Sequence, residues 1–327
     1  MNRRDLVRIG SLSLLARQPF HALAARLQLL PPNVRIGHTH GRPALIENDH
    51  LRIGVDLASG GAISYFSQKH PERNLVNHHD TGRFIQQSYY GGLDGSHWSG
   101  RRWRWNPVQG GGCHGERAKV LDSQITPTEI YAKTEPKLWA TGANVPDATM
   151  EEWIHLHGKC AHLHFKFTYN GSRRNDAALQ EVPAVFMDYE LSRLVSYTGN
   201  KPWTEAPLTY REIGWPNEQV RADENWAAFV DENGWGLGVY FPGTSAVTAY
   251  RYRPTKNPMT GPDGDACSYL APTQRLTILP GFTYSYDVGL TIGTSSEIRR
   301  EFYGLHENRE IQPGTILLHD APAREHS

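Results

Sequence analysis

The segment from Thr81 to Gly112 carries side chains of the kind that bind sugars. It places amides, an arginine, tyrosines and tryptophans between glycine pairs, beginning TGRFIQQSYYGG and ending WRWNPVQGGG. Aromatic rings stack on the apolar faces of pyranoses, while planar amide and guanidinium groups bind vicinal hydroxyls. The segment therefore predicts a carbohydrate-binding surface; the structural alternative is a strand pair with its rings in the core. The candidate contacts, one of them further along the chain, are Arg83, Gln87, Trp105, Asn106, Gln109 and Trp139.

Cleavage of a glycosidic bond needs a proton donor and a second group that acts as base or nucleophile. Glu181 begins a mostly apolar run that ends near Asp188. Desolvation in such surroundings would raise the pKa of the Glu181 carboxyl and suit it to general acid catalysis. We therefore expect the catalytic groups among Glu181, Asp188, His114 and Tyr89, while an ion pair at a sheet edge is the alternative for Glu181.

β-Elimination on a uronate would assign different catalytic roles to these residues. Asn106, Gln109 and Arg83 would neutralise the uronate carboxylate, and a tyrosine or His114 would take the C5 proton. Tyr89 and Tyr90 are adjacent, and neighbouring residues of a strand point to opposite faces. At most one of these two tyrosines can therefore line a given site.

Four histidines alternate with mainly apolar residues over 154–165, inside the predicted hairpin Glu151–Tyr169. If the turn has four residues, His157 faces His162 and His155 faces His164. Imidazoles at alternate strand positions could hold Zn²⁺ or Cu²⁺. A merely solvated face is the alternative that we favour, so we predict neither a metal nor another cofactor.

Most of the elements that would position these groups are predicted to be strands. Short alternating segments separated by turn residues recur from Leu45 to Ile292, with hairpins over 51–67, 119–133, 151–169 and 225–241. One helix is predicted after Ser296 as N-cap and a shorter one over Leu191–Tyr197. The pattern predicts a single all-β domain, a large antiparallel β-supersandwich with little helix, over 45–310, and a loosely held tail over 311–327.

The amino-acid composition limits the classes of binding partner that we expect. The 34 basic residues (Lys and Arg) equal the 34 acidic ones, so neither nucleic acid nor an acidic membrane surface is an expected partner. The three cysteines do not form a disulfide scaffold. No segment after the first residues approaches the length of a membrane span, and we expect no membrane anchor.

The first 24 residues look like an export signal. Asn2–Arg8 contains an arginine pair of the twin-arginine type, and a short apolar run and Ala22-Leu23-Ala24 follow it. We therefore expect a signal peptide over 1–24 and a bacterial periplasmic or secreted location. An amphipathic N-terminal helix is the alternative.

Several motifs resemble a known family. Ser59–Ile63, Gly82-Arg83 and the stretch NPVQGG over 106–111 resemble, in order and spacing, the first third of galactose mutarotase-like proteins, the β-supersandwich of aldose 1-epimerases. Ser268–Pro272 and Leu279–Gly281 look like the closing strands of that fold, so the resemblance covers most of 45–293. It implies a sugar ligand.

The epimerase catalytic residues are not matched. Those enzymes carry a histidine before the glycine pair, where this chain has Gln109, and a glutamate before a Thr-Gln pair, where it has Ala271-Pro272. Glutamine cannot deliver a proton at neutral pH, and alanine and proline cannot act as bases. We therefore predict an exported enzyme that cleaves glycosidic bonds of a poly- or oligosaccharide by hydrolysis or β-elimination. A non-catalytic periplasmic glycan-binding protein and an atypical mutarotase-like epimerase are the alternatives.

Overall fold

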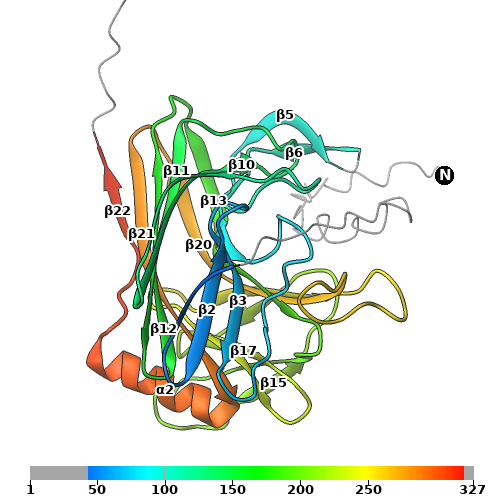
Figure 1. Ribbon diagram of the computed structural model, residues 1–327, viewed down its shortest axis with the longest axis vertical. Coiled ribbons are helices and arrows are strands. Elements are labelled where there is room, and N and C mark those ends of the chain that lie inside the picture. The colour runs from blue at the N-terminus through cyan, green and yellow to red at the C-terminus, as the bar shows by residue number, and fades with distance from the viewer. Residues whose placement is uncertain (1–42, 99, 320–327) are drawn as a thin grey trace, which may run out of the picture.

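Two large antiparallel sheets face each other in the computed structural model, which describes residues 43–98 and 100–319 (Figure 1). In the order of their pairing, the strands of the first sheet are β1 (Ala44–Glu47), β2 (Leu51–Asp56), β3 (Ala62–Gln68), β4 (Ile85–Ser88), β13 (Asn175–Asp188), β20 (Cys267–Ile278), β19 (Ala246–Tyr252) and β16 (Glu218–Arg221), with the short strands β7 (Pro107–Val108) and β10 (Lys137–Leu138) alongside β4. The predicted all-β antiparallel sandwich is confirmed.

The second sheet contains the strands with the clearest alternation in the sequence. Its strands are β15 (Thr209–Glu212), β14 (Arg193–Ser196), β17 (Trp226–Val230), β18 (Trp235–Tyr240), β21 (Phe282–Thr294), β12 (Cys160–Tyr169), β11 (Ala148–His157), β9 (Glu129–Glu135) and β8 (Lys119–Ile125), with β22 (Thr315–Leu318) added to β21. A separate hairpin consists of β5 (Leu93–Trp98) and β6 (Arg101–Arg104).

The main core lies between the two large sheets. On β12, Leu163, Phe165 and Phe167 point inward, where each is buried almost completely. The ring of Tyr89 stacks on Phe167 with 4.0 Å between the centroids, which connects the segment after β4 to the opposite sheet. Burial of each such side chain stabilises the fold by about 1.5–3 kcal/mol.

An irregularity in β13 decides which of its residues face away from this core. The register of β13 against both β4 and β20 shifts after Glu181. Because alternate residues of a regular strand share a face, Glu181 and Ala184 would otherwise point to opposite sides. The extra residue places them on the same face, and Phe186 continues it, whereas Val185 and Met187 point into the main core.

The helix α2 (Ser295–Asn308) covers the second sheet at the lower end of Figure 1. Its N-cap is Thr294, not the predicted Ser296: the Thr294 hydroxyl accepts a hydrogen bond from the Glu297 amide, and the Glu297 carboxylate binds the Thr294 amide. This reciprocal pair satisfies two amides of the first turn. Phe302 on the buried face packs against Trp226 and Tyr240 of the sheet.

Two other local predictions are wrong. Arg193–Ser196, inside the segment Leu191–Tyr197 predicted as a helix, forms β14, because it is hydrogen-bonded between β15 and β17. The turn of the β11–β12 hairpin contains only Gly158 and Lys159, so His155 faces His162 and His157 faces Cys160. Gly158 has a φ of 55°, a conformation that tight two-residue turns require and that glycine adopts without strain.

The ends of the chain are described in part. The predicted signal peptide, 1–24, lies outside the described residues. Within the predicted tail, 311–327, Thr315–Leu318 forms β22 and is hydrogen-bonded to β21, so this part of the tail is held in the sheet. In the part of the chain that is described, no helix has the length and apolar character needed to cross a membrane.

Candidate functional site

A pocket opens on the face of the first sheet that is turned away from the main core. It contains about 610 Å³ of empty volume, a figure that includes open solvent. The aromatic residues that line it are Tyr90, Trp98, Trp103, Trp139, Phe186, Trp215, Tyr250 and Tyr269. The polar lining residues are Gln86, Ser88, Asn106, Glu181 and Asn217.

Three tryptophans form one wall of the pocket. Trp98 on β5 and Trp103 on β6 lie 5.2 Å apart between ring centroids, and Trp139, which follows β10, lies 4.7 and 5.3 Å from them. Such a cluster offers flat apolar surfaces of the kind on which sugar rings stack. Among the described residues, the buried indole N–H groups of Trp103 and Trp215 have no hydrogen-bond acceptor.

The carboxyl of Glu181 lies in the sheet-side wall of the pocket. The Tyr90 hydroxyl donates a hydrogen bond to Glu181 Oε2 over 2.7 Å, and the hydroxyl of Tyr269 on the neighbouring strand is also within hydrogen-bonding reach. Burial raises the pKa of Glu181 above its ordinary value, and the two hydroxyls, with the charge of Arg104, offset part of that effect. The environment thus favours the protonated carboxyl.

The tyrosines around Glu181 remain protonated. Burial, and then the negative charge that Glu181 carries when ionised, raise the pKa values of Tyr90 and Tyr269 well above the ordinary value. The guanidinium of Arg104 lies 5.7 Å from the centroid of the Tyr90 ring. These phenols can therefore donate hydrogen bonds, but they are poor bases.

Glu181 is the only carboxyl group among the described residues that line the pocket. Most glycosidases flank the scissile bond with two carboxyls. The described lining thus supplies one candidate proton donor and no second carboxylate.

Three of the ten sequence-predicted site residues line the pocket: Glu181, Asn106 and Trp139. The Asn106 amide donates to the Tyr89 carbonyl over 2.7 Å. Trp139 belongs to the tryptophan wall, and Glu181 supplies the carboxyl group of the lining. The structure brings these three together from segments that are 33 to 75 residues apart in the sequence.

The other predicted polar contacts are engaged elsewhere. The Arg83 guanidinium donates to Asn77 and to the Asp265 carbonyl at 3.0 and 3.1 Å and lies 3.3 Å from Asp80. The side-chain oxygen of Gln109 accepts a hydrogen bond from the backbone N–H of Gln87 over 3.2 Å. Both glutamines are fully buried, and neither lines the pocket.

The remaining predicted residues lie in the core or at the surface. Tyr89 packs on Phe167, and Trp105 packs edge-on against Tyr169 at 5.4 Å. The buried Asp188 accepts a hydrogen bond from Arg73 over 2.6 Å. The side chain of His114 is exposed. None of these four lines the pocket, and the catalytic or binding roles of all ten residues stay predictions.

Several lining residues were not among the predicted site residues. Tyr250 and Tyr269 stack on each other at 4.5 Å from β19 and β20, and Trp215 packs against Tyr250 at 4.9 Å. Tyr269 lies opposite Phe186 of β13, and Tyr250 lies opposite Tyr269, so β20 and β19 continue the pocket face of β13 across the sheet. The alternation of aromatic residues around Tyr250 was the one local sequence signal for this part of the lining. It did not decide the matter, because an aromatic residue on a strand points into the core by default.

The four histidines of the β11–β12 hairpin do not converge as one set. His155 pairs with Glu129 at 2.9 Å and His164 with Asp287 at 2.6 Å. His157 and His162 both face Glu310. The four histidines, considered in the sequence as the less favoured metal-binding alternative, are therefore divided between three carboxylates.

No family model and no curated protein matches the chain. Similar solved structures include a galactose mutarotase related enzyme from Lactobacillus acidophilus, with 10% identity and a TM-score of 0.49 over 77% of this chain and 97% of that one. A galactose mutarotase-like protein from Lactobacillus casei matches with 11% identity and a TM-score of 0.48 over 77% and 99%. An alpha-mannosidase from Enterococcus faecalis matches with 10% identity and a TM-score of 0.48 over 86% of this chain and 33% of that one. Galactose mutarotase-like structures are thus among the matches, as the sequence motifs predict.

Proposed function

We propose that the protein binds a neutral sugar unit of an oligo- or polysaccharide in this pocket and cleaves a glycosidic bond, with Glu181 as the general acid. The observation that carries the proposal is a buried carboxyl with a raised pKa in a pocket that three clustered tryptophans also line. A carboxyl with a raised pKa keeps its proton to higher pH and can donate it to a leaving oxygen.

The lining favours a neutral sugar over a uronate. No lysine or arginine is among the described residues that line the pocket, and its one ionisable acid is Glu181. A uronate carboxylate would have to rely on the amides of Gln86, Asn106 and Asn217, and its charge would oppose ionisation of Glu181. The tyrosines are also poor bases for taking a C5 proton. Hydrolysis is therefore supported better than β-elimination.

A non-catalytic glycan-binding protein is the second candidate. The absence of a second carboxyl from the described lining favours it, because aromatic rings and amides alone suffice for binding. In either case we propose a periplasmic or secreted location, which rests on the arginine pair near the N-terminus.

The test compares turnover with binding in three variants. Reducing ends released from a panel of neutral and uronic oligosaccharides would identify a substrate, and calorimetry would measure its affinity. We expect E181Q to lose turnover about 100-fold or more while it keeps its affinity, because the amide fills the same space but cannot donate the proton of a carboxylic acid.

The W139A variant is expected to show the opposite pattern, with affinity weakened by about three- to tenfold through the lost stacking surface. H114N serves as the control, because the exposed His114 lies outside the pocket. Turnover of E181Q at the wild-type rate would rule out the general acid. Tight binding with no turnover of any glycan would support the binding protein instead.

A further inference from the structure

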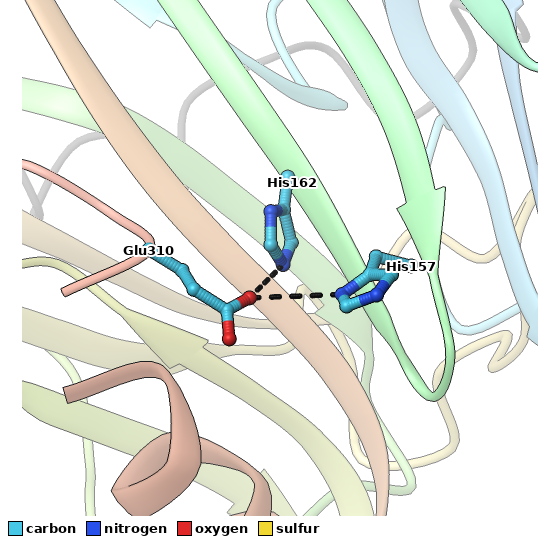
Figure 2. Close-up of side chains that lie close together, drawn as sticks. All are labelled: His157, His162 and Glu310. Carbon is cyan, nitrogen blue, oxygen red and sulfur yellow. Dashed lines mark ion pairs between the residues drawn. The ribbon is translucent and has the colours of Figure 1, made fainter. Parts of the chain in front are cut away.

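The end of the β11–β12 hairpin and the segment after α2 bring two imidazoles and a carboxylate to one point (Figure 2). His157 Nδ1 lies 3.6 Å and His162 Nε2 lies 3.8 Å from the same oxygen, Oε2 of Glu310. The three potential ligand atoms all lie within 4.8 Å of one another. The cluster is separate from the pocket, since none of β11, β12 and α2 contributes a residue to the pocket lining.

These separations are too long for direct hydrogen bonds but short enough for ligands of one ion. Hydrogen bonds to a carboxylate span about 2.7–2.9 Å. Tetrahedral Zn²⁺ with bonds of about 2.0–2.2 Å holds its ligand atoms roughly 3.3–3.6 Å apart. Among the described residues, the buried Nε2 of His162 has no hydrogen-bond partner, although a carboxylate lies nearby. A small adjustment of the side chains would therefore satisfy an ion and this orphaned nitrogen together.

The carboxylate is oriented by its own segment. Asn308 donates a hydrogen bond to Glu310 Oε1 over 3.0 Å, which leaves Oε2 directed at the histidines. The backbone is fixed as well, because the Glu310 amide donates to the Leu305 carbonyl at the end of α2 and Arg309 closes the helix in the left-handed conformation. Hydrogen-bonded support of this kind is typical of metal-ligating carboxylates.

We propose that His157, His162 and Glu310 form a Zn²⁺ site whose fourth position is open to solvent. Two imidazoles and one carboxylate suit Zn²⁺, whereas Ca²⁺ requires six to eight oxygens. The side chain of His157 is 77% exposed, so ions can enter from the surface. Bound zinc ties the hairpin turn to the end of α2 and stabilises the packing of the helix on the second sheet.

The experiment uses the full chain without a histidine tag, freed of metal with a chelator and titrated with ZnCl₂ by calorimetry. We expect one equivalent to bind and the melting temperature to rise with zinc concentration. Cobalt, substituted for zinc, is expected to give the visible absorption of a tetrahedral site. Neither readout depends on a sugar substrate or on Glu181, so failure here is distinguishable from failure of the proposed function.

Variants locate the site. E310Q and H162N should each weaken zinc binding by about tenfold or more. H155N and H164N, which change histidines on the same face that pair with other carboxylates, should bind zinc as the unchanged protein does. Because Glu310 is surface-accessible, E310Q tests the site even if H162N fails to fold. The absence of one-equivalent binding, or equal affinity in E310Q, would overturn the proposal.

Discussion

At the residue scale, Glu181 is subject to two opposing effects. Burial favours its neutral form, while hydrogen bonds from Tyr90 and Tyr269 favour the carboxylate. Burial is the larger effect and the pKa is raised. A general acid must be protonated to act, so activity should fall as the pH rises through the pKa of Glu181.

Removal of the Tyr90 hydroxyl should shift this falling limb. Y90F deletes the 2.7 Å hydrogen bond that favours the carboxylate, so the pKa of Glu181 rises further and the falling limb of kcat moves to higher pH. The measurement is kcat against pH for both proteins on the substrate identified above. Y131F is the control, because the Tyr131 hydroxyl binds Glu151 on the second sheet. A limb that stays in place or moves to lower pH would contradict the acid role.

Residue types alone could not separate ligand contacts from structural ones. Nothing in the sequence shows that the Arg83 guanidinium is already bound. In the structure it donates hydrogen bonds to Asn77 and to the carbonyls of Gly264 and Asp265, in a loop about 180 residues away. Glu181 could be predicted because its apolar neighbours already implied desolvation. Trp98 had no such local signal, since its role depends on contacts with Trp103 and Trp139.

At the element scale, the shift in β13 shows the limit of pattern analysis. A period of two assigns Glu181 and Ala184 to opposite faces; the local mark of the change in register is Pro183, which cannot donate a ladder hydrogen bond. The error in the predicted length of the β11–β12 turn had a smaller effect. Shortening the turn from four residues to two moves each partner by two positions, so the histidines keep their common face although their pairing changes.

The cap of α2 provides a test at this scale. T294A removes the hydroxyl that caps the first turn and should lower the free energy of unfolding by about 1 kcal/mol. S296A, at the residue that the sequence predicts as N-cap, should leave stability nearly unchanged because Ser296 is exposed inside the helix. Denaturant unfolding measures both. An equal loss in the two variants would contradict the assigned cap.

At the scale of the whole molecule, a buried carboxyl lies between the sheets. Glu152 on β11 points into the main core between Met150 and Ile154 and is fully buried. Burial raises its pKa to about 8, and the neighbouring amide of Gln109 offsets only part of this effect. The group is therefore mainly neutral at pH 7.

Global stability should consequently depend on pH through Glu152. Between its ordinary value of 4.5 and about 8 the unfolded chain releases a proton that the folded chain retains. This linkage lowers the free energy of unfolding by about 1.4 kcal/mol per pH unit in that window. E152Q removes this contribution, so the variant should gain stability relative to the unchanged protein as the pH rises from 5 to 8. Denaturant unfolding across this range is the measurement; a stability difference independent of pH would contradict it.

The class of fold could be predicted because alternation and turn residues are local properties of each strand. The pairing of distant strands could not, and the pocket depends on it. Glu181 meets Tyr269 only because β13 and β20, about 90 residues apart, are neighbours. The same non-local pairing explains why the sequence analysis considered Glu181 and Tyr90 but not Tyr269, which also lies beside Glu181.

The hairpin β5–β6 forms a two-stranded sheet of its own, while Glu181 is carried by the first large sheet. Trp98 and Trp103 therefore depend on a segment whose pairing is not part of either large sheet. Under the proposed function, changes in this hairpin that keep Arg104 would alter which sugar the tryptophan wall accepts, yet leave Glu181 and its tyrosines in place. Selectivity and reactivity are thus, under the same proposal, separately evolvable, and a library confined to 93–103, which spares Arg104 beside Tyr90, is the natural starting point for redirecting the pocket to other glycans.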